Sequence, residues 1–234
     1  AVGLMLLWAN DFRAVFAVAI IPAALCVALL VLGVQEPERP AGAPRVNPIS
    51  QASLQRLPRA YWWVVGVGAV FTLARFSEAF LVLRAEQVGI ALALVPLVMV
   101  AMNAVFSVTA YPFGKLSDRV SHRRLLLAGL AVLVLADVVL AASTHWTGLL
   151  LGVALWGVHM GMTQGLLAAM VADTAPADLR GTAYGFFNLM SGLAMLAASV
   201  VAGLLWQYWG PAWTFGAGAM FSAVAMAALR GRRG

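Results

Sequence analysis

Two oppositely charged residues stand close together inside a long apolar stretch of the sequence. Arg75 and Glu78 occur in "TLARFSEAF", three positions apart, so a continuous helix would place both on one face. Charged side chains are costly in an apolar medium and are kept where they pair, bind a ligand or carry a proton. Two readings stay open. The pair neutralises itself against a neighbouring helix, or Glu78 binds a proton or substrate with Arg75 as its partner.

Other polar residues lie singly inside apolar runs. Asp137 lies about 12 residues, or ~18 Å, into one run, and His159 lies at similar depth in the next run, which also carries Gln164. A carboxylate and an imidazole at one level can form a proton relay. For His159 a packed, hydrogen-bonded role is nevertheless favoured, and Asp137 is interpreted as a structural partner of a neighbouring helix. Asn103 and Asn188 complete the candidates for substrate or proton binding.

A dense group of charges separates two of the apolar runs. We call this segment, "YPFGKLSDRVSHRR" at residues 111–124, the polar knot. Gly114 is expected to let the chain turn sharply, and Asp118 to cap a helix or pair with Arg119. An ordinary basic loop between two membrane helices is the simplest interpretation. The spacing G-x-L-x-D-R-x-x-x-R-R is formed by Gly114, Leu116, Asp118, Arg119, Arg123 and Arg124.

The composition identifies the elements that must position these residues. Of the 234 residues, 63% are hydrophobic and only 10% are charged, whereas soluble domains carry about 25% charged residues. One spanning helix needs roughly 20 apolar residues. The sequence therefore predicts an all-α polytopic membrane protein. Its expected spans are residues 14–34, 60–83, 88–111, 124–142, 146–171, 182–206 and 211–229. Residues 1–9 are interpreted as the tail of a helix whose beginning is missing, so the chain is expected to be a fragment.

The basic residues are distributed asymmetrically. Alternate connections carry most of the 15 Lys and Arg residues: Arg39, Arg45, Arg56 and Arg59, then Lys115, Arg119, Arg123 and Arg124, then Arg180, and finally Arg230, Arg232 and Arg233. By the positive-inside rule, the proline-rich linker at 35–59, the polar knot and the C-terminus are predicted to be cytoplasmic. The pI near 10.4 is thereby explained without nucleic acid as a partner. A short interfacial helix is expected near Ser50 to Leu57.

Several other patterns narrow the function. Gly157, Gly161 and Gly165 form a small-residue stripe, which is typical of closely packed membrane helices. The histidines lack the spacing of a metal site, Cys26 is the sole cysteine, and no phosphate-binding glycine loop is present. The sequence therefore predicts no enzyme, no metal and no cofactor.

The polar knot closely resembles the signature loop of the major facilitator superfamily, G-x-L-[SA]-D-R-x-x-R-R, with one additional residue before the arginine pair. "FRAVFAVAIIPAALCVALLVLGVQEPE" is similar to the sixth helix of that family and its following loop. "APADLRGTAYGFFNLMSGL" resembles its tenth-to-eleventh loop and eleventh helix, with matches at Pro176, Arg180, Gly181, Ala183, Gly185 and Asn188.

The resemblance implies a domain organisation. Residues 1–34 would be the partial fifth helix and the sixth helix of an N-terminal bundle, residues 35–59 the cytoplasmic linker, and residues 60–234 the second six-helix bundle of a twelve-helix carrier. The first bundle of the same protein would be the missing partner, and the loop around Asp118 would latch one conformation against it.

The resemblance also implies alternating-access transport of a small solute. Lys115 is the single lysine among the 15 basic residues, and alanine is abundant; this bias is typical of a GC-rich bacterial genome, so a bacterial inner membrane is expected. Proton-coupled drug or metabolite efflux is favoured, because the spans carry few charges. A sugar or organic-acid importer, and a membrane sensor or scaffold that transports nothing, are the alternatives.

Overall fold

The protein is described by a computed structural model that covers residues 2–8, 11–33 and 51–231. These residues form helices and turns without a β-strand. Three helices precede the main bundle, and they are α1 (Val2–Leu7), α2 (Phe12–Gly33) and α3 (Gln51–Gln55). The bundle consists of α4 (Arg59–Ala74), α5 (Ala79–Gln87), α6 (Pro96–Ser117), α7 (His122–Ala142), α8 (Trp146–Thr174), α9 (Arg180–Trp209) and α10 (Pro211–Gly231). Two 3-10 turns, η1 (Leu92–Leu94) and η2 (Ala177–Leu179), precede α6 and α9.

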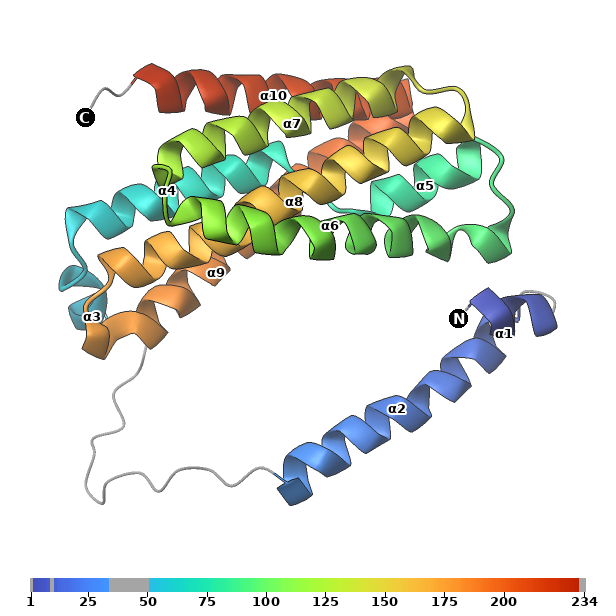
Figure 1. Cartoon of the computed structure of the whole chain (residues 1–234), viewed down its shortest axis with the longest axis horizontal. Coiled ribbons are helices and arrows are strands. Elements are labelled where there is room, and N and C mark those ends of the chain that lie inside the picture. The colour runs from blue at the N-terminus through green and yellow to red at the C-terminus, as the bar shows by residue number, and fades with distance from the viewer. Residues whose placement is uncertain (1, 9–10, 34–50, 232–234) are drawn as a thin grey trace.

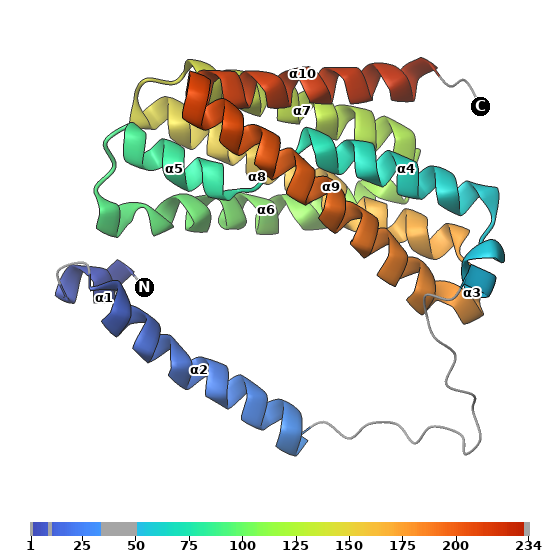
Figure 2. The same cartoon turned by 180° about the vertical axis from the view of Figure 1, so that it is seen from behind.

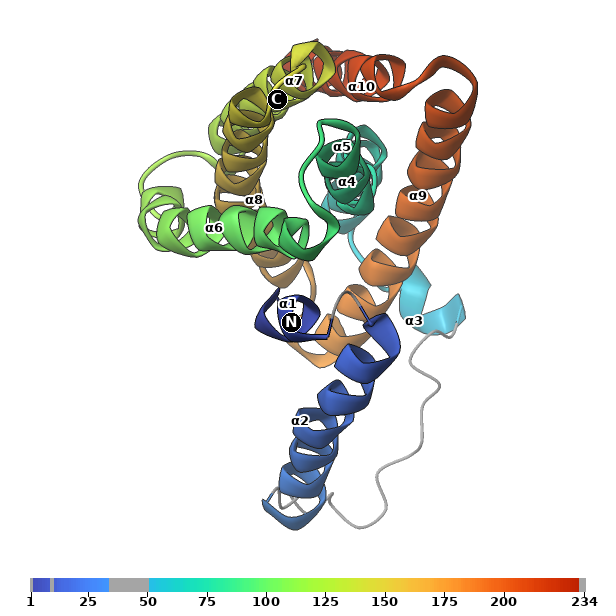
Figure 3. The same ribbon diagram turned by 90° about the vertical axis from the view of Figure 1, so that its right-hand side faces the viewer.

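The bundle is arranged around α4 and α5. In the end-on view, these two helices lie inside a ring formed by α6, α8, α7, α10 and α9, and the ring is open between α6 and α9 (Figure 3). Helix α9 crosses the others obliquely (Figure 2). Helix α2 lies apart from the bundle (Figure 1), and its described side chains are mostly exposed. An isolated apolar helix of this kind requires a lipid or protein environment to cover it.

The apolar spans predicted from the sequence are confirmed as helices, with shifted ends. Among the described residues, six helical segments are long and apolar enough to cross a membrane: Arg13–Gly33, Arg59–Gln87, Leu92–Ser117, His122–Ala142, Trp146–Thr174 and Ala177–Trp209. Helix α10 is not among these six, but its 21 residues extend about 31 Å at 1.5 Å per residue, which is also long enough to cross the hydrocarbon core. The chain is thus a multi-pass helical membrane protein.

Two local expectations are wrong. The span predicted at 60–83 is not one continuous helix, since α4 ends at Ala74 and α5 starts at Ala79. Gly114 does not turn the chain, because α6 continues through it to Ser117. There the Ser117 hydroxyl donates to the Gly114 carbonyl at 2.6 Å, and the turn follows at residues 118–121. A lysine in the last helical turn, Lys115, favours this longer helix by facing its negative end.

The linker is described only in part. Residues 34–50, which hold most of the linker predicted at 35–59, lie outside the described residues. The short helix expected near Ser50 to Leu57 is present as α3. The arginine after it, Arg56, forms an ion pair with Asp178 in η2 at 2.6 Å. Both side chains are more than half exposed, so this contact positions α3 with little stabilisation.

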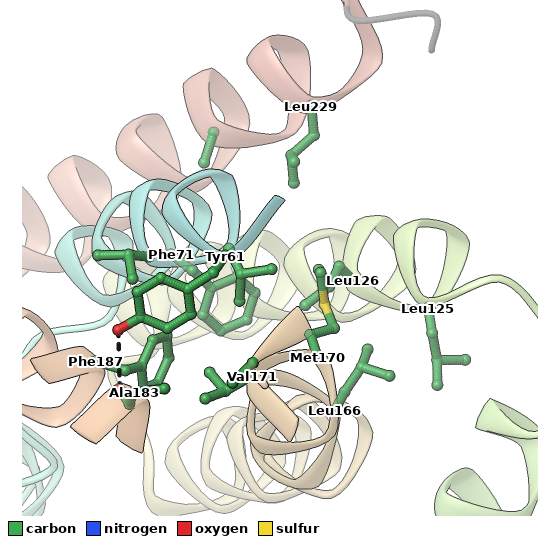
Figure 4. Packing of buried hydrophobic residues seen from close by; sticks show 14 of the residues in the cluster. Tyr61, Phe71, Leu125, Leu126, Leu166, Met170, Val171, Ala183, Phe187 and Leu229 are labelled. Atoms are coloured by element: carbon green, nitrogen blue, oxygen red, sulfur yellow. Dashed lines mark hydrogen bonds between the residues drawn. The ribbon is translucent and has the colours of Figure 1, made fainter. Parts of the chain in front are cut away.

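The bundle contains two hydrophobic clusters, one toward each end. The cluster nearer the start of α4 joins α4, α7, α8, α9 and α10 (Figure 4). Tyr61 is fully buried there, and its hydroxyl donates to the Ala183 carbonyl at 2.9 Å. The other cluster surrounds Phe76, Trp156 and Phe215, whose rings lie 5.5 Å apart in the pairs Phe76–Trp156 and Phe76–Phe215. The break between α4 and α5 lies between these two clusters.

Candidate functional site

Residues 75–78 interrupt the span formed by α4 and α5, and we call them the helix break. The Arg75 amide still donates to the Thr72 carbonyl at 3.1 Å. The Ser77 amide instead donates to the Ser199 hydroxyl of α9 at 3.3 Å. The ring of Phe76 inserts into the second cluster, at 4% exposure. An aromatic anchor and a hydrogen bond to α9 therefore hold the backbone out of the helix, a device tolerated in membranes where other helices satisfy the freed groups.

The charged pair lies within this break. Arg75 and Glu78 do not share a helical face as expected, because neither residue belongs to α4 or α5. They also form no ion pair. Among the described residues, Arg56 and Asp178 are the only oppositely charged side chains whose nitrogen and oxygen atoms lie within 4.0 Å of each other. Both side chains are half-buried. The self-neutralising pair is thus not formed here, although the charge of Arg75 acts on Glu78 and on His159.

His159 is fully buried on α8 beside the helix break. Its Nδ1 lies 2.8 Å from the Gly129 carbonyl of α7. A carbonyl oxygen only accepts, so Nδ1 carries the proton and Nε2 of the neutral ring holds a lone pair. The ring stacks on Phe71 at 5.3 Å, while Nε2 is buried without a partner among the described residues. The hydrogen-bonded structural role expected for this histidine therefore holds for Nδ1, whereas Nε2 forms no hydrogen bond with any described residue.

Asp137 is fully buried on α7 but is not bonded to His159. The interpretation of Asp137 as a structural partner of a neighbouring helix stays a prediction: its carboxyl group faces Gly218 of α10, and neither of its oxygens has a hydrogen-bond partner among the described residues. The relay with His159 is not formed either, since the imidazole bonds to Gly129, two helical turns earlier on α7. The residue also lies in the last third of α7 rather than near its middle.

The remaining candidates lie on exposed parts of the bundle. Asn103 on α6, Gln164 on α8 and Asn188 on α9 are exposed. The Asn103 amide donates to the Met99 carbonyl of its own helix at 2.8 Å. Gln164 lines a groove of about 430 Å³ between α6 and α8. These three residues thus lie on three different helices, of which α6 and α9 flank the opening in Figure 3, and they do not form one cluster with Arg75 and Glu78.

The residues of the polar knot separate into two groups. Gly114, Leu116, Asp118, Arg119 and Arg124 are exposed at the junction of α6 and α7. Arg123 instead reaches across to the end of α10, where its Nη2 donates to the Leu229 and Arg230 carbonyls at 2.5 and 3.0 Å. A cation at a helix C-terminus satisfies unpaired carbonyls and the helix dipole. This cap could not be found from the sequence, because the two segments lie more than 100 residues apart.

The second loop motif is also mainly exposed. Pro176 precedes η2, and Arg180, Gly181 and Gly185 lie exposed in the first turns of α9. A Cβ at Gly181 or Gly185 would meet nothing within 4 Å. The motif therefore leaves a smooth, uncovered surface at the start of α9.

Two glycines of the stripe on α8 lie against α6. A Cβ at Gly157 would lie 2.6 Å from the Met102 carbonyl oxygen, and one at Gly161 would collide with Thr109. Gly165 differs, because a Cβ there would meet nothing within 4 Å. The close contact of α6 and α8 thus depends on two positions, while Gly165 lines the groove beside Gln164.

The chain was compared with known proteins. A family model described as Major Facilitator Superfamily matches residues 65–233. An uncharacterized MFS-type transporter of Methanocaldococcus jannaschii is 30% identical over 177 residues, which is 73% of this chain and 44% of that protein. The class B tetracycline resistance protein of Escherichia coli is 34% identical over 107 residues, 45% of this chain and 26% of its own length. The glucose transporter GlcP of Staphylococcus epidermidis is 30% identical over 88 residues, 38% of this chain and 20% of its own length.

The chain spans about half or less of the length of the curated relatives that it matches. The family model covers most of the bundle, including the helix break, the polar knot and the second loop motif. The helix positions and the motif spacing agree with this match. The chain therefore belongs to the major facilitator superfamily.

Proposed function

We propose that the chain is the second bundle, the preceding sixth helix and a stub of the fifth helix of a secondary active transporter. The full protein would move a small solute by alternating access, with two six-helix bundles rocking about a site near the middle of the bilayer. The opening of the ring between α6 and α9 is the side on which the first bundle would lie. Residues 35–59 would form the connection between the two bundles.

The helix break carries this proposal. Charged groups inside a membrane protein are costly, and unwound backbone at membrane depth occurs where it lies within protein or lines a water-filled cavity. Arg75 and Glu78 stand in such a break, where both are half-buried and neither forms an ion pair with another described residue. A self-neutralised structural pair would instead have its charges in contact. Because these two side chains do not neutralise each other in an ion pair, they are available to a solute or a proton that enters from the opening.

We assign proton coupling to Glu78. A carboxyl group that gains and loses a proton changes the charge at the break, which biases the two orientations of the bundles differently. Arg75 would hold the ionised form and would be released when the proton binds. Asn103, Gln164 and Asn188 would contribute polar contacts to the solute from the flanking helices.

The favoured solute is an apolar or amphiphilic compound that is exported. Around Gln164, the groove is lined mainly by phenylalanine, glycine and other apolar residues, and such surfaces favour ligands of the same kind. A sugar or organic-acid importer is the alternative of the same fold. The names of the relatives support both directions, since one is a tetracycline resistance protein and another a glucose transporter.

The basic residues support an orientation in a bacterial inner membrane. Arg56 precedes α4 and Arg59 is its first residue, and the polar knot and Arg230 lie at the same end of the bundle. By the positive-inside rule this end would face the cytoplasm. The exposed residues Asp118 and Arg119 would then latch one state of the carrier against the first bundle, and Gly181 and Gly185 would form the corresponding contact on α9.

The test is transport by the full-length protein with Glu78→Gln, beside Glu86→Gln as the matched control. Glu86 is exposed near the end of α5, so its replacement should leave transport unchanged. Ethidium efflux and D-glucose counterflow are measured in proteoliposomes over a range of pH. We expect pH-dependent ethidium efflux that becomes slow and independent of pH in Glu78→Gln. An unchanged rate and pH profile in that variant would overturn the role of Glu78.

The two alternatives give other outcomes in the same assay. Glucose counterflow without ethidium efflux would contradict the exporter hypothesis and support the importer hypothesis. A sensor or scaffold would transport neither compound, and it would have no need to keep Arg75 and Glu78, since leucine at both positions would cost less free energy in the bilayer.

A further inference from the structure

Asp137 is a buried carboxyl group that the proposed transport mechanism does not use. Its side chain has 0% exposure, and both oxygens lack a hydrogen-bond partner among the described residues. It points from α7 toward α10, where a Cβ at Gly218 would lie 2.7 Å from Oδ2. The glycine at this position is what leaves room for the carboxyl group between the two helices.

The helix break contributes to the wall of the same site. The Cβ position at Gly218 would also lie 2.8 Å from Cε1 of Phe76, so this ring and the Asp137 carboxyl group border the same space at Gly218. Phe76 packs against Trp156 of α8, whose indole Nε1 is likewise buried without a partner among the described residues. Two unpartnered polar groups from α7 and α8 thus meet the aromatic anchor of the break.

The charged and titratable groups around Asp137 can be named for each element. Helix α8 contributes Trp156 and, one turn further, His159, whose Nδ1 is held by Gly129. Helix α10 contributes Ser222, also buried and unpartnered among the described residues, and no ionisable side chain before Arg230 at its far end. The helix break contributes Arg75 and Glu78. None of these residues forms a hydrogen bond or an ion pair with the Asp137 carboxylate among the described residues.

The environment decides which ligand the carboxyl group can hold. An ionised carboxylate that is buried without hydrogen bonds is very costly, whereas the neutral acid loses much less on leaving water. A metal cation would need several oxygen or nitrogen ligands, and the described residues contain no group of three His, Cys, Asp or Glu that could hold one. A proton is the ligand that this site accommodates.

We propose that Asp137 is a proton-binding site distinct from Glu78, occupied in this conformation and linked to the helix break through Phe76. When the break rearranges and Phe76 moves away, water reaches the carboxyl group, the O–H bond breaks, and the proton passes to water while the carboxylate is left hydrated. Binding of the proton in the closed site does not depend on the proposed transport function. Its release during a transport cycle does.

Infrared difference spectroscopy tests proton binding directly. Spectra of the full-length protein in lipid nanodiscs are recorded at about pH 7, where exposed carboxyl groups are ionised, and the spectrum of Asp137→Asn is subtracted from that of the unmodified protein. We expect the carbonyl band of a protonated carboxyl group. Asp173→Asn, at an exposed aspartate near the end of α8, should remove only carboxylate bands. Loss of only carboxylate bands in Asp137→Asn as well would overturn the proposal.

Asp137→Glu keeps the test decisive if the amide variant does not fold. It should shift the frequency of the protonated band without abolishing it, and an unshifted band would assign the signal to another residue.

The link to the break is tested by hydrogen exchange at residues 75–78. Exchange there should rise more steeply with pH in the unmodified protein than in Asp137→Asn, because proton binding and the break's conformation are reciprocally coupled. Equal slopes would overturn the link, whatever Glu78→Gln does to transport.

Discussion

Replacing Gly157 with alanine should destabilise the contact between α6 and α8. The new Cβ would lie 2.6 Å from the Met102 carbonyl oxygen and 3.0 Å from Cβ of Val105. The first of these atoms belongs to the backbone of α6, so the helices must separate to relieve the overlap. Overpacking of this kind costs about 1–3 kcal/mol, and alanine recovers about 1 kcal/mol through its higher helix propensity.

Gly165→Ala is the matched control, because it gains the same helix propensity without the overlap. It lies two turns further on the same helix, and a Cβ there would meet nothing within 4 Å. The difference between the two variants therefore isolates the overpacking cost of about 1–3 kcal/mol. In a chain of this size that corresponds to a melting temperature roughly 2–12 °C lower for Gly157→Ala.

Thermal unfolding of the purified protein in detergent, followed by tryptophan fluorescence, measures this difference. Gly216→Ala serves as a second control, because Gly216 is exposed on α10 with open space around its Cβ position. Equal melting temperatures for Gly157→Ala and both controls would show that α6 and α8 are not in close contact, and would refute this packing.

Three further outcomes are expected. Tyr61→Phe should lower stability by about 1–2 kcal/mol in chemical unfolding, because the buried hydrogen bond from the Tyr61 hydroxyl to the Ala183 carbonyl is lost; an unchanged midpoint would contradict that bond. Arg56→Ala should change stability by less than about 1 kcal/mol at low salt and not at all at high salt, since its pair with Asp178 is exposed; a larger effect would contradict a surface contact. Arg123→Met should speed amide exchange in the last turn of α10 while leaving α7 unchanged; equal protection would contradict the cap.

The sequence predicted the membrane fold because long apolar runs leave few alternatives. The spans, the polar knot and the second loop motif all follow from local patterns of composition and spacing. The helix break did not, because its causes lie far away in the chain. Phe76 inserts between Trp156 and Phe215, and Ser199 of α9 binds the Ser77 amide. Nothing in "ARFSEA" itself forbids a helix.

Side-chain partners were the least predictable part of the site. The depth of Asp137 and His159 within their runs suggested a relay, but depth does not determine the rotation of each helix. The imidazole faces Gly129 and Phe71, whereas the carboxyl group faces Gly218. Glycine at positions 129 and 218 is the signal that could have separated them, since each leaves space for a side chain from the neighbouring helix.

The central claim is that the helix break lines a cavity that opens alternately to the two sides of the membrane. Side-specific labelling of Ser77→Cys, with the native Cys26 replaced by serine, tests it most directly. Membrane-impermeant thiol reagents are applied to the full-length protein from the outside and, in inverted vesicles, from the inside. Thr163→Cys, at a fully buried threonine of α8, is the matched control and should stay unmodified. Alternating access predicts that position 77 reacts from both sides; reaction from one side only, or from neither, would contradict the account.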